Sequence, residues 1–251
     1  MIKRFEPIDL TKLGLKHERP EISSEEKAER TERGRKEFQK RKNGLILKAI
    51  FKHVQAVSYR GFRVGASLVA ENKTADGGYV EESEHNFKPR EHKQNAWDKL
   101  CAENNICSAA IMDGAGYIPG IVVASHHRII GKQKEDDNHS QDVLHSCMNC
   151  RNLFRDLIKQ GIMDDETVIR FVNDDSLVYE DEADKEFMGT DNDGQEVWAP
   201  KLKLRREITE QDVADLPNEE MTMKEFLSLE KYKNDLSWEK GYTPAPYDLV
   251  S

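Results

Sequence analysis

Two short stretches decide the fold of this chain: Cys101-Ala102-Glu103 and, further along, Ser146-Cys147-Met148-Asn149-Cys150-Arg151. We predict that each stretch begins a helix, the first at Cys101 and the second at Cys147. In a first helical turn, Cys147 and Cys150 would share one face because they are three residues apart. Helix N-termini carry unpaired N–H groups and a partial positive charge, which should lower the pKa of thiols placed there.

These residue types suit a catalytic zinc ion. Zinc held by three protein ligands keeps its fourth position open for water, whereas a structural site closes with four ligands. The remaining cysteine, Cys107, follows Cys101 on roughly the opposite face of a helix and is a poor fourth ligand. The pattern therefore indicates Zn²⁺ on Cys101, Cys147 and Cys150, with Glu103 as an unligated proton carrier. The alternatives are ordinary buried cysteines or a closed structural zinc site.

The order of motifs resembles that of the cytidine deaminase superfamily. The matching stretches are Phe62-Arg63-Val64-Gly65-Ala66, Asn86, Cys101-Ala102-Glu103 and Cys147-Met148-Asn149-Cys150-Arg151. They are similar to the branch with three cysteines, which includes blasticidin-S deaminase-like enzymes, and the similarity covers about residues 46–172. A further stretch, 221–228, resembles the closing helix of the family.

The resemblance implies roles for the matching positions. It implies that Cys101, Cys147 and Cys150 hold zinc and that Glu103 moves protons between the zinc-bound water, the ring nitrogen and the leaving amine. Phe62 would pack against the base and Asn86 would bind a sugar hydroxyl. The backbone of Ala102 would hydrogen-bond the base edge. A homo-oligomer, either dimer or tetramer, is also implied.

The sequence departs from the family pattern at the expected sugar site. The family's Asn-x-Glu reads Asn86-Phe87-Lys88 here, so a cation replaces a carboxylate. Lys88 and the neighbouring cations of residues 90–93 could contact a phosphate or an acidic substituent. The alternative is a solvated loop.

Two further departures lie next to the predicted ligands. Ser146 replaces the proline common before the second cysteine, and Asn104 replaces an arginine that helps to neutralise the thiolates. Arg151 is a candidate for the compensating cation.

Alternating patterns predict an α/β fold. We expect strands at 62–70, 79–85, 121–125 and 167–172, a turn at 76–77, and helices that begin near Cys101 and span 148–159, the second ended by Gly161. This order predicts a three-layer α/β/α mixed sheet with helices on both faces.

The flanking segments predict embellishments of one domain. Residues 1–45 read as an N-terminal arm and a charged helix opened by a capping box at 23–26, with a break at Gly44 before a second, apolar helix. Residues 46–235 form the predicted catalytic domain, with an acidic insertion at about 174–216. Residues 236–251 are a tail. The stretch 191–194 is similar to a calcium loop but lacks the later glutamate, so a solvated loop is favoured.

The composition of the chain argues against two classes of binding partner, nucleic acids and membranes. The 251 residues carry a net charge of −9, which argues against nucleic acid as the main substrate. No apolar run is long enough for a membrane span, the N-terminus lacks the apolar core of a signal peptide, and thiolate ligands need a reducing compartment, so the cytoplasm is expected.

The sequence therefore favours a zinc-dependent hydrolytic deaminase of a cytosine-type nucleoside or a related aminopyrimidine. A deaminase of a nucleotide or a decorated nucleoside antibiotic, and a non-catalytic zinc-stabilised binding module, remain alternatives. Four histidines, at positions 126, 127, 139 and 145, lie near the motifs. We expect them to be surface or loop residues and not ligands.

Overall fold

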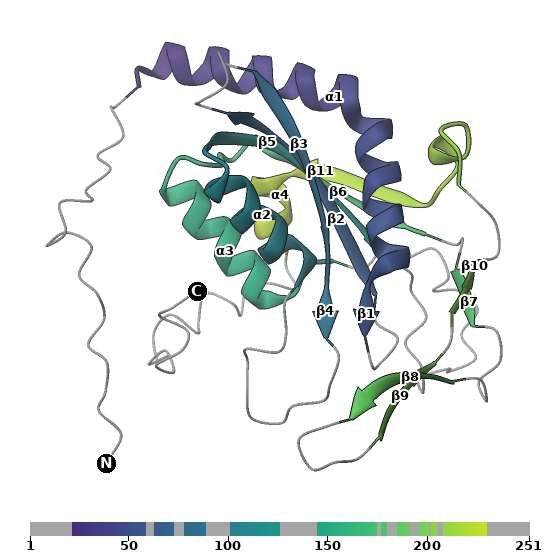
Figure 1. Ribbon diagram of the computed structural model, residues 1–251. Coiled ribbons are helices and arrows are strands. Elements are labelled where there is room, and N and C mark those ends of the chain that lie inside the picture. Colours follow the sequence, from purple (N-terminus) through teal and green to yellow (C-terminus); the bar gives the residue numbers. More distant parts are fainter. Residues whose placement is uncertain are drawn as a thin grey trace, which may run out of the picture.

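A five-stranded mixed sheet forms the centre of the computed structural model (Figure 1). The structure describes residues 22–58, 63–72, 78–88, 101–125, 145–174, 177–179, 185–190, 196–200, 202–204 and 208–229. The strand order is β11–β6–β5–β2–β3. These strands are β2 (Val64–Asn72), β3 (Tyr79–His85), β5 (Ala115–Ser125), β6 (Val168–Asn173) and β11 (Asn218–Thr222). The β5–β6 pair is parallel, and the other pairs are antiparallel.

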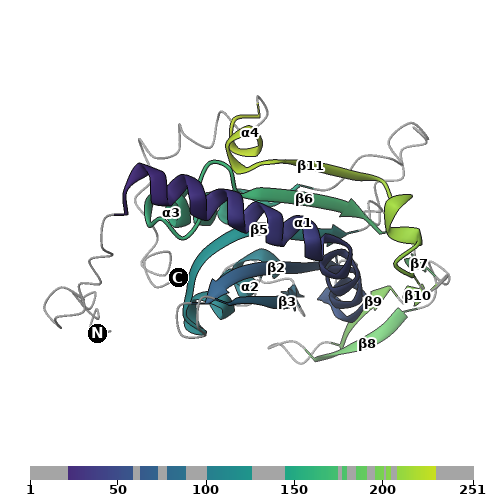
Figure 2. The ribbon, with the colours of Figure 1, turned by 90° about the horizontal axis from the view of Figure 1, so that it is seen from above.

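One helix, α1 (Ser24–Gln55), covers one face of this sheet. In Figure 2 it lies across the near face, and its apolar residues pack on alternate positions of β2, β5 and β6. Glycines permit the close approach: a Cβ at Gly65 would overlap the carbonyl oxygen of Ala49, and one at Gly120 would overlap the ring of Phe38. The N-terminus has the predicted capping box, in which Ser23 and Glu26 bond each other's backbone N–H.

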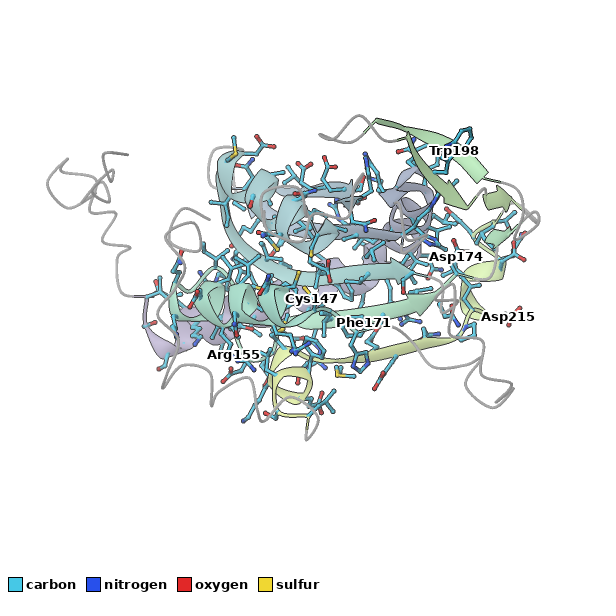
Figure 3. All side chains as sticks on the ribbon, turned by 90° about the horizontal axis from the view of Figure 1, so that it is seen from below. Cys147, Arg155, Phe171, Asp174, Trp198 and Asp215 are labelled. Atoms are coloured by element: carbon cyan, nitrogen blue, oxygen red, sulfur yellow. The ribbon has the colours of Figure 1, made fainter. Side chains whose placement is uncertain are left out.

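The other face carries α2 (Ala102–Met112) and α3 (Met148–Lys159), which lie in front of the sheet in Figure 3. Their apolar residues join those of α4 (Met223–Leu227) in a second core cluster on the opposite side of the same strands. The predicted three-layer α/β/α arrangement, with helices on both faces of a mixed sheet, is therefore confirmed.

Shorter elements lie outside the main sheet. β1 (Val57–Ser58) pairs with β4 (Phe87–Lys88), while β7 (Leu177–Tyr179) pairs with β10 (Leu202–Leu204). β8 (Lys185–Thr190) pairs with β9 (Glu196–Pro200), and a 3₁₀ turn, η3 (Asp212–Ala214), precedes β11. The described strands of the acidic insertion thus form two small antiparallel ladders, drawn at the lower right of Figure 1. The sequence analysis assigned no strands to them.

The predicted break at Gly44 is wrong, because the chain stays helical from Ser24 to Gln55. Phe38, Leu45 and Ile46 all face the sheet, so one buried stripe continues across Gly44. The helix does change direction part-way along (Figure 1). The Ser67 hydroxyl donates to the Leu45 carbonyl, a type of contact that bends helices.

The other predicted elements agree closely with the structure. β3 and α3 have the predicted bounds, while β2 is shifted by two residues and ends at Asn72. β5 begins earlier than expected, at Ala115, because the strand continues through Pro119 and Gly120. The predicted turn at 76–77, the calcium-like stretch at 191–194, and the segments 1–21 and 236–251 lie outside the described residues. Within the described part of the chain, no helix is both long and apolar enough to cross a membrane.

Candidate metal centre

Two helix N-termini bring three thiols together. Cys101 is the N-cap of α2 and Cys147 is the N-cap of α3, both with extended backbone dihedrals, as the sequence predicted. Cys150 follows in the first turn of α3 and is buried. The Sγ atoms of Cys101 and Cys147 are 3.6 Å apart, and those of Cys147 and Cys150 are 3.5 Å apart. All three Sγ atoms lie within 4.8 Å of one another.

This spacing fits a zinc ion. Zn–S bonds of about 2.3 Å in a tetrahedral site place the sulfur atoms about 3.8 Å apart. Among the described residues, the group that could hold a metal ion comprises the three cysteines, and Cys107 is not part of it. The Cys107 side chain is instead fully buried in the apolar core beneath α2. Three thiolates leave one tetrahedral position for water.

The thiols need a cation in order to ionise together. The hydrogen bond with Cys147 raises the pKa of Cys101 to about 12, with desolvation and the charge of Glu103 acting in the same direction. Hydrogen bonds with Cys101 and Cys147, followed by burial, also raise the pKa of Cys150. The expected lowering of the thiol pKa values by the helix N-termini stays a prediction. A divalent cation would lower these pKa values.

Glu103 lies in the first turn of α2 and is 4% exposed. Its charge contributes to the raised pKa of both Cys101 and Cys150, so its carboxylate lies near the thiol cluster. It does not belong to the group of potential ligands. A buried carboxylate beside the ligands, yet outside the ligand group, is placed as a proton carrier requires.

The α3 terminus is held by Arg151, which is buried. Its backbone N–H donates to the Cys147 carbonyl, 3.0 Å away, and its guanidinium donates to the Ser146 carbonyl. The guanidinium therefore fixes the peptide that leads into Cys147. Its role in compensating thiolate charge stays a prediction, as does the effect of Asn104.

The predicted substrate residues are described to different extents. Ala102 is fully buried at the start of α2. Asn86 is also fully buried, and its Oδ1 accepts a hydrogen bond of 2.8 Å from the Val64 N–H. Asn86 thus joins β2 to the segment between β3 and β4. Lys88 lies in β4, but the structure describes only its backbone. Phe62 lies outside the described residues.

Comparisons with known proteins give a partial likeness. No protein-family model matches the chain, and no curated protein matches it. Solved structures that match include the cytidine deaminase of Burkholderia pseudomallei, 21% identical over 53% of this chain and 84% of that chain, with a TM-score of 0.36. The cytidine deaminase of Mycobacterium leprae is 23% identical over 50% of this chain and 83% of its own, with a TM-score of 0.32.

A third match is the cytidine deaminase of Mycobacterium tuberculosis, 22% identical over 51% of this chain and 79% of its own, with a TM-score of 0.30. These values describe a limited similarity. The chemistry of the centre therefore rests on its own thiols and carboxylate.

One nearby histidine lies in the irregular segment before α3 and outside the thiol group, as expected. The side chain of this residue, His145, is nevertheless largely buried, and its ring contacts Phe171, Phe226 and Glu219. Sequence reasoning missed this contact, since Glu219 is 74 residues away. The only feature of the sequence that pointed to a role for His145 was its position two residues before Cys147. The other three histidines, at 126, 127 and 139, lie outside the described residues.

Proposed function

We propose that the chain is a zinc-dependent hydrolytic deaminase that acts on a cytosine-type nucleoside or a related aminopyrimidine and releases ammonia. The observation that carries this proposal is the meeting of three thiols from two helix N-termini beside a buried, unligated carboxylate. A closed structural site needs a fourth ligand and has no use for that carboxylate.

Cys101, Cys147 and Cys150 would hold the ion. A bound zinc ion supplies hydroxide at neutral pH, because it lowers the pKa of water from about 15.7 to about 7. Glu103 would carry one water proton to the ring nitrogen and the second water proton to the amine that leaves as ammonia. A positioned acid–base group of this kind contributes about 10² to 10⁴ in rate. The net reaction exchanges an amino group for a carbonyl oxygen at the expense of one water.

The substrate contacts are also proposals. The backbone of Ala102 would bond the base edge, Phe62 would pack on the base, and Asn86 would contact the sugar. The Asn86 Oδ1 already accepts from Val64, so the amide N–H₂ is the group assigned to the sugar hydroxyl. Lys88 would bind a phosphate or another acidic substituent of the substrate. This contact extends the proposal to nucleotides and decorated nucleosides.

The experiment is ammonia release from a panel of substrates by protein of known zinc content. The panel contains cytidine, deoxycytidine, their phosphates and aminopyrimidine antibiotics. Turnover of one class identifies the substrate. If Lys88 reads a phosphate, Lys88→Gln raises KM for the nucleotide and leaves KM for the nucleoside unchanged. One zinc per chain with no turnover across the panel would favour a non-catalytic binding module.

Two properties follow from the proposal and need their own tests. The three thiolates require a reducing environment, which agrees with a cytoplasmic enzyme. The proposed assembly is a homo-oligomer, either a dimer or a tetramer, which light scattering on the purified protein would measure.

A further inference from the structure

The His145 ring is packed into the second core cluster beside the candidate metal centre. Its centroid lies 4.6 Å from that of Phe171 on β6 and 5.6 Å from that of Phe226 on α4. The two phenylalanine rings are themselves 5.1 Å apart. His145 thus joins an aromatic group formed by the sheet and the closing helix, and its side chain is only 6% exposed.

A carboxylate fixes the direction of this ring. His145 Nε2 lies 2.6 Å from Glu219 Oε2. Glu219 on β11 is the direct cross-strand partner of Phe171 on β6, so one point of the ladder supplies both the packing surface and the hydrogen-bond partner. The ring is therefore held by stacking on one side and by a charge-assisted bond at its edge.

Only Ser146 separates His145 from Cys147, so a displacement of the histidine backbone passes directly to the ligand. Figure 3 labels Cys147 at the start of α3 and Phe171, the packing partner of His145, on β6.

We propose that His145 is a positioning residue that anchors the Cys147 peptide to β6, β11 and α4, so that Cys147 and Cys150 meet Cys101 at ligating distance. This inference rests on the zinc centre of the proposed function. It links the segment after the acidic insertion to the metal centre, because Glu219 and Phe226 both come from that segment. His145 acts through Cys147 and is not itself a ligand.

The test is zinc affinity, measured by chelator competition on the full chain. Loss of an outer partner of a metal ligand typically weakens metal binding 10- to 100-fold. We expect this loss for His145→Ala and a smaller one for His145→Phe, which keeps the aromatic packing but loses the bond to Glu219. Glu219→Gln should resemble His145→Phe, since it weakens the same bond.

The matched control is Glu220→Gln. Glu220 neighbours Glu219 on β11, but it faces the other side of the sheet and pairs with Arg170 at 2.6 Å. Its loss should leave zinc affinity within about twofold of the wild type. The cobalt-substituted protein provides a second readout: its thiolate charge-transfer and d–d absorption bands should shift in the His145 variants and not in the control.

Urea unfolding of the metal-free proteins separates positioning from general stability. The Glu219→Gln and Glu220→Gln variants should unfold at similar urea concentrations yet differ in zinc affinity. Zinc affinity and cobalt spectra that are unchanged in the His145→Phe and Glu219→Gln variants would overturn the inference while leaving the proposed function intact. A wild-type chain that binds no zinc would overturn both.

Discussion

His53 Nδ1 lies 2.8 Å from Asp174 Oδ2, and both side chains are fully buried. The pair connects the last turn of α1 to the residue that follows β6, and the backbone N–H of Asp174 also donates to the Ser125 carbonyl at the end of β5. Figure 3 shows Asp174 at one end of the sheet, well away from Cys147. The contact therefore secures α1 on the face opposite to the metal centre.

Asp174→Ala should lower the free energy of unfolding by about 3 kcal/mol, because removal of one partner leaves the other buried without its counterpart. Urea denaturation followed by circular dichroism measures the loss. The control is Asp156→Ala, whose partner Lys159 is 3.3 Å away on the exposed side of α3. Its loss should cost about 0.5 kcal/mol or less. Equal losses in the two variants would show that the buried pair has no special importance.

Gly65→Ala should destabilise the protein by about 2 kcal/mol or more, because the new Cβ meets the backbone of Ala49 and His53, which cannot move without shifting α1. Gly44→Ala is the opposite case. Nothing lies within 4 Å of its Cβ position, so alanine should stabilise α1 by about 0.5 to 1 kcal/mol. Thermal unfolding of the two variants measures both effects. A stable Gly65→Ala variant would contradict the close packing of α1 on β2.

Tyr117 should make stability depend on pH in alkaline solution. Its hydroxyl donates to Asp164 Oδ2 at 2.8 Å, and burial, followed by the charge of Asp164, raises the pKa of the phenol. The folded state therefore keeps the proton longer than the unfolded state, in which the tyrosine pKa is about 10. This contribution is fully present below that value and is lost as pH rises above it.

The corresponding variant is Tyr117→Phe, which should lose about 1 to 2 kcal/mol at neutral pH with the hydrogen bond. Its stability should then fall less steeply than that of the wild type as the pH rises above about 10. Urea midpoints of the wild type and of the variant, measured at several alkaline pH values, give the slope of stability against pH for each protein. Parallel slopes would mean that the Tyr117 proton is not linked to folding.

Local patterns predicted the parts of the fold in which neighbouring residues decide the structure. The capping box at Ser23 and the helix starts at Cys101 and Cys147 each depend on residues within one turn. β3 was recognised from its flanking turn signals. The Cys147–Cys150 pair followed from local spacing, whereas the addition of Cys101, 46 residues before Cys147, rested on the order of the motifs.

The contacts that the sequence did not predict are long-range. His53 and Asp174 are 121 residues apart, and nothing in the neighbourhood of either residue indicates the other. Gly44 read as a helix break because glycine is a poor helix former, but burial of Leu45 and Ile46 against the sheet outweighs that preference. Pro119 and Gly120 obscured the start of β5 in a similar way. Gly120 is needed there because the Phe38 ring occupies the space of a side chain.

The most direct measurement is ammonia release by Glu103→Gln beside the wild type, with zinc content measured in both proteins. Glutamine keeps the size of the side chain and removes its ability to carry a proton, while the three thiols remain in place. The account predicts one zinc per chain in each protein and a rate reduced by about 10²-fold or more in the variant. Equal turnover by the two zinc-loaded proteins would contradict the proposed mechanism.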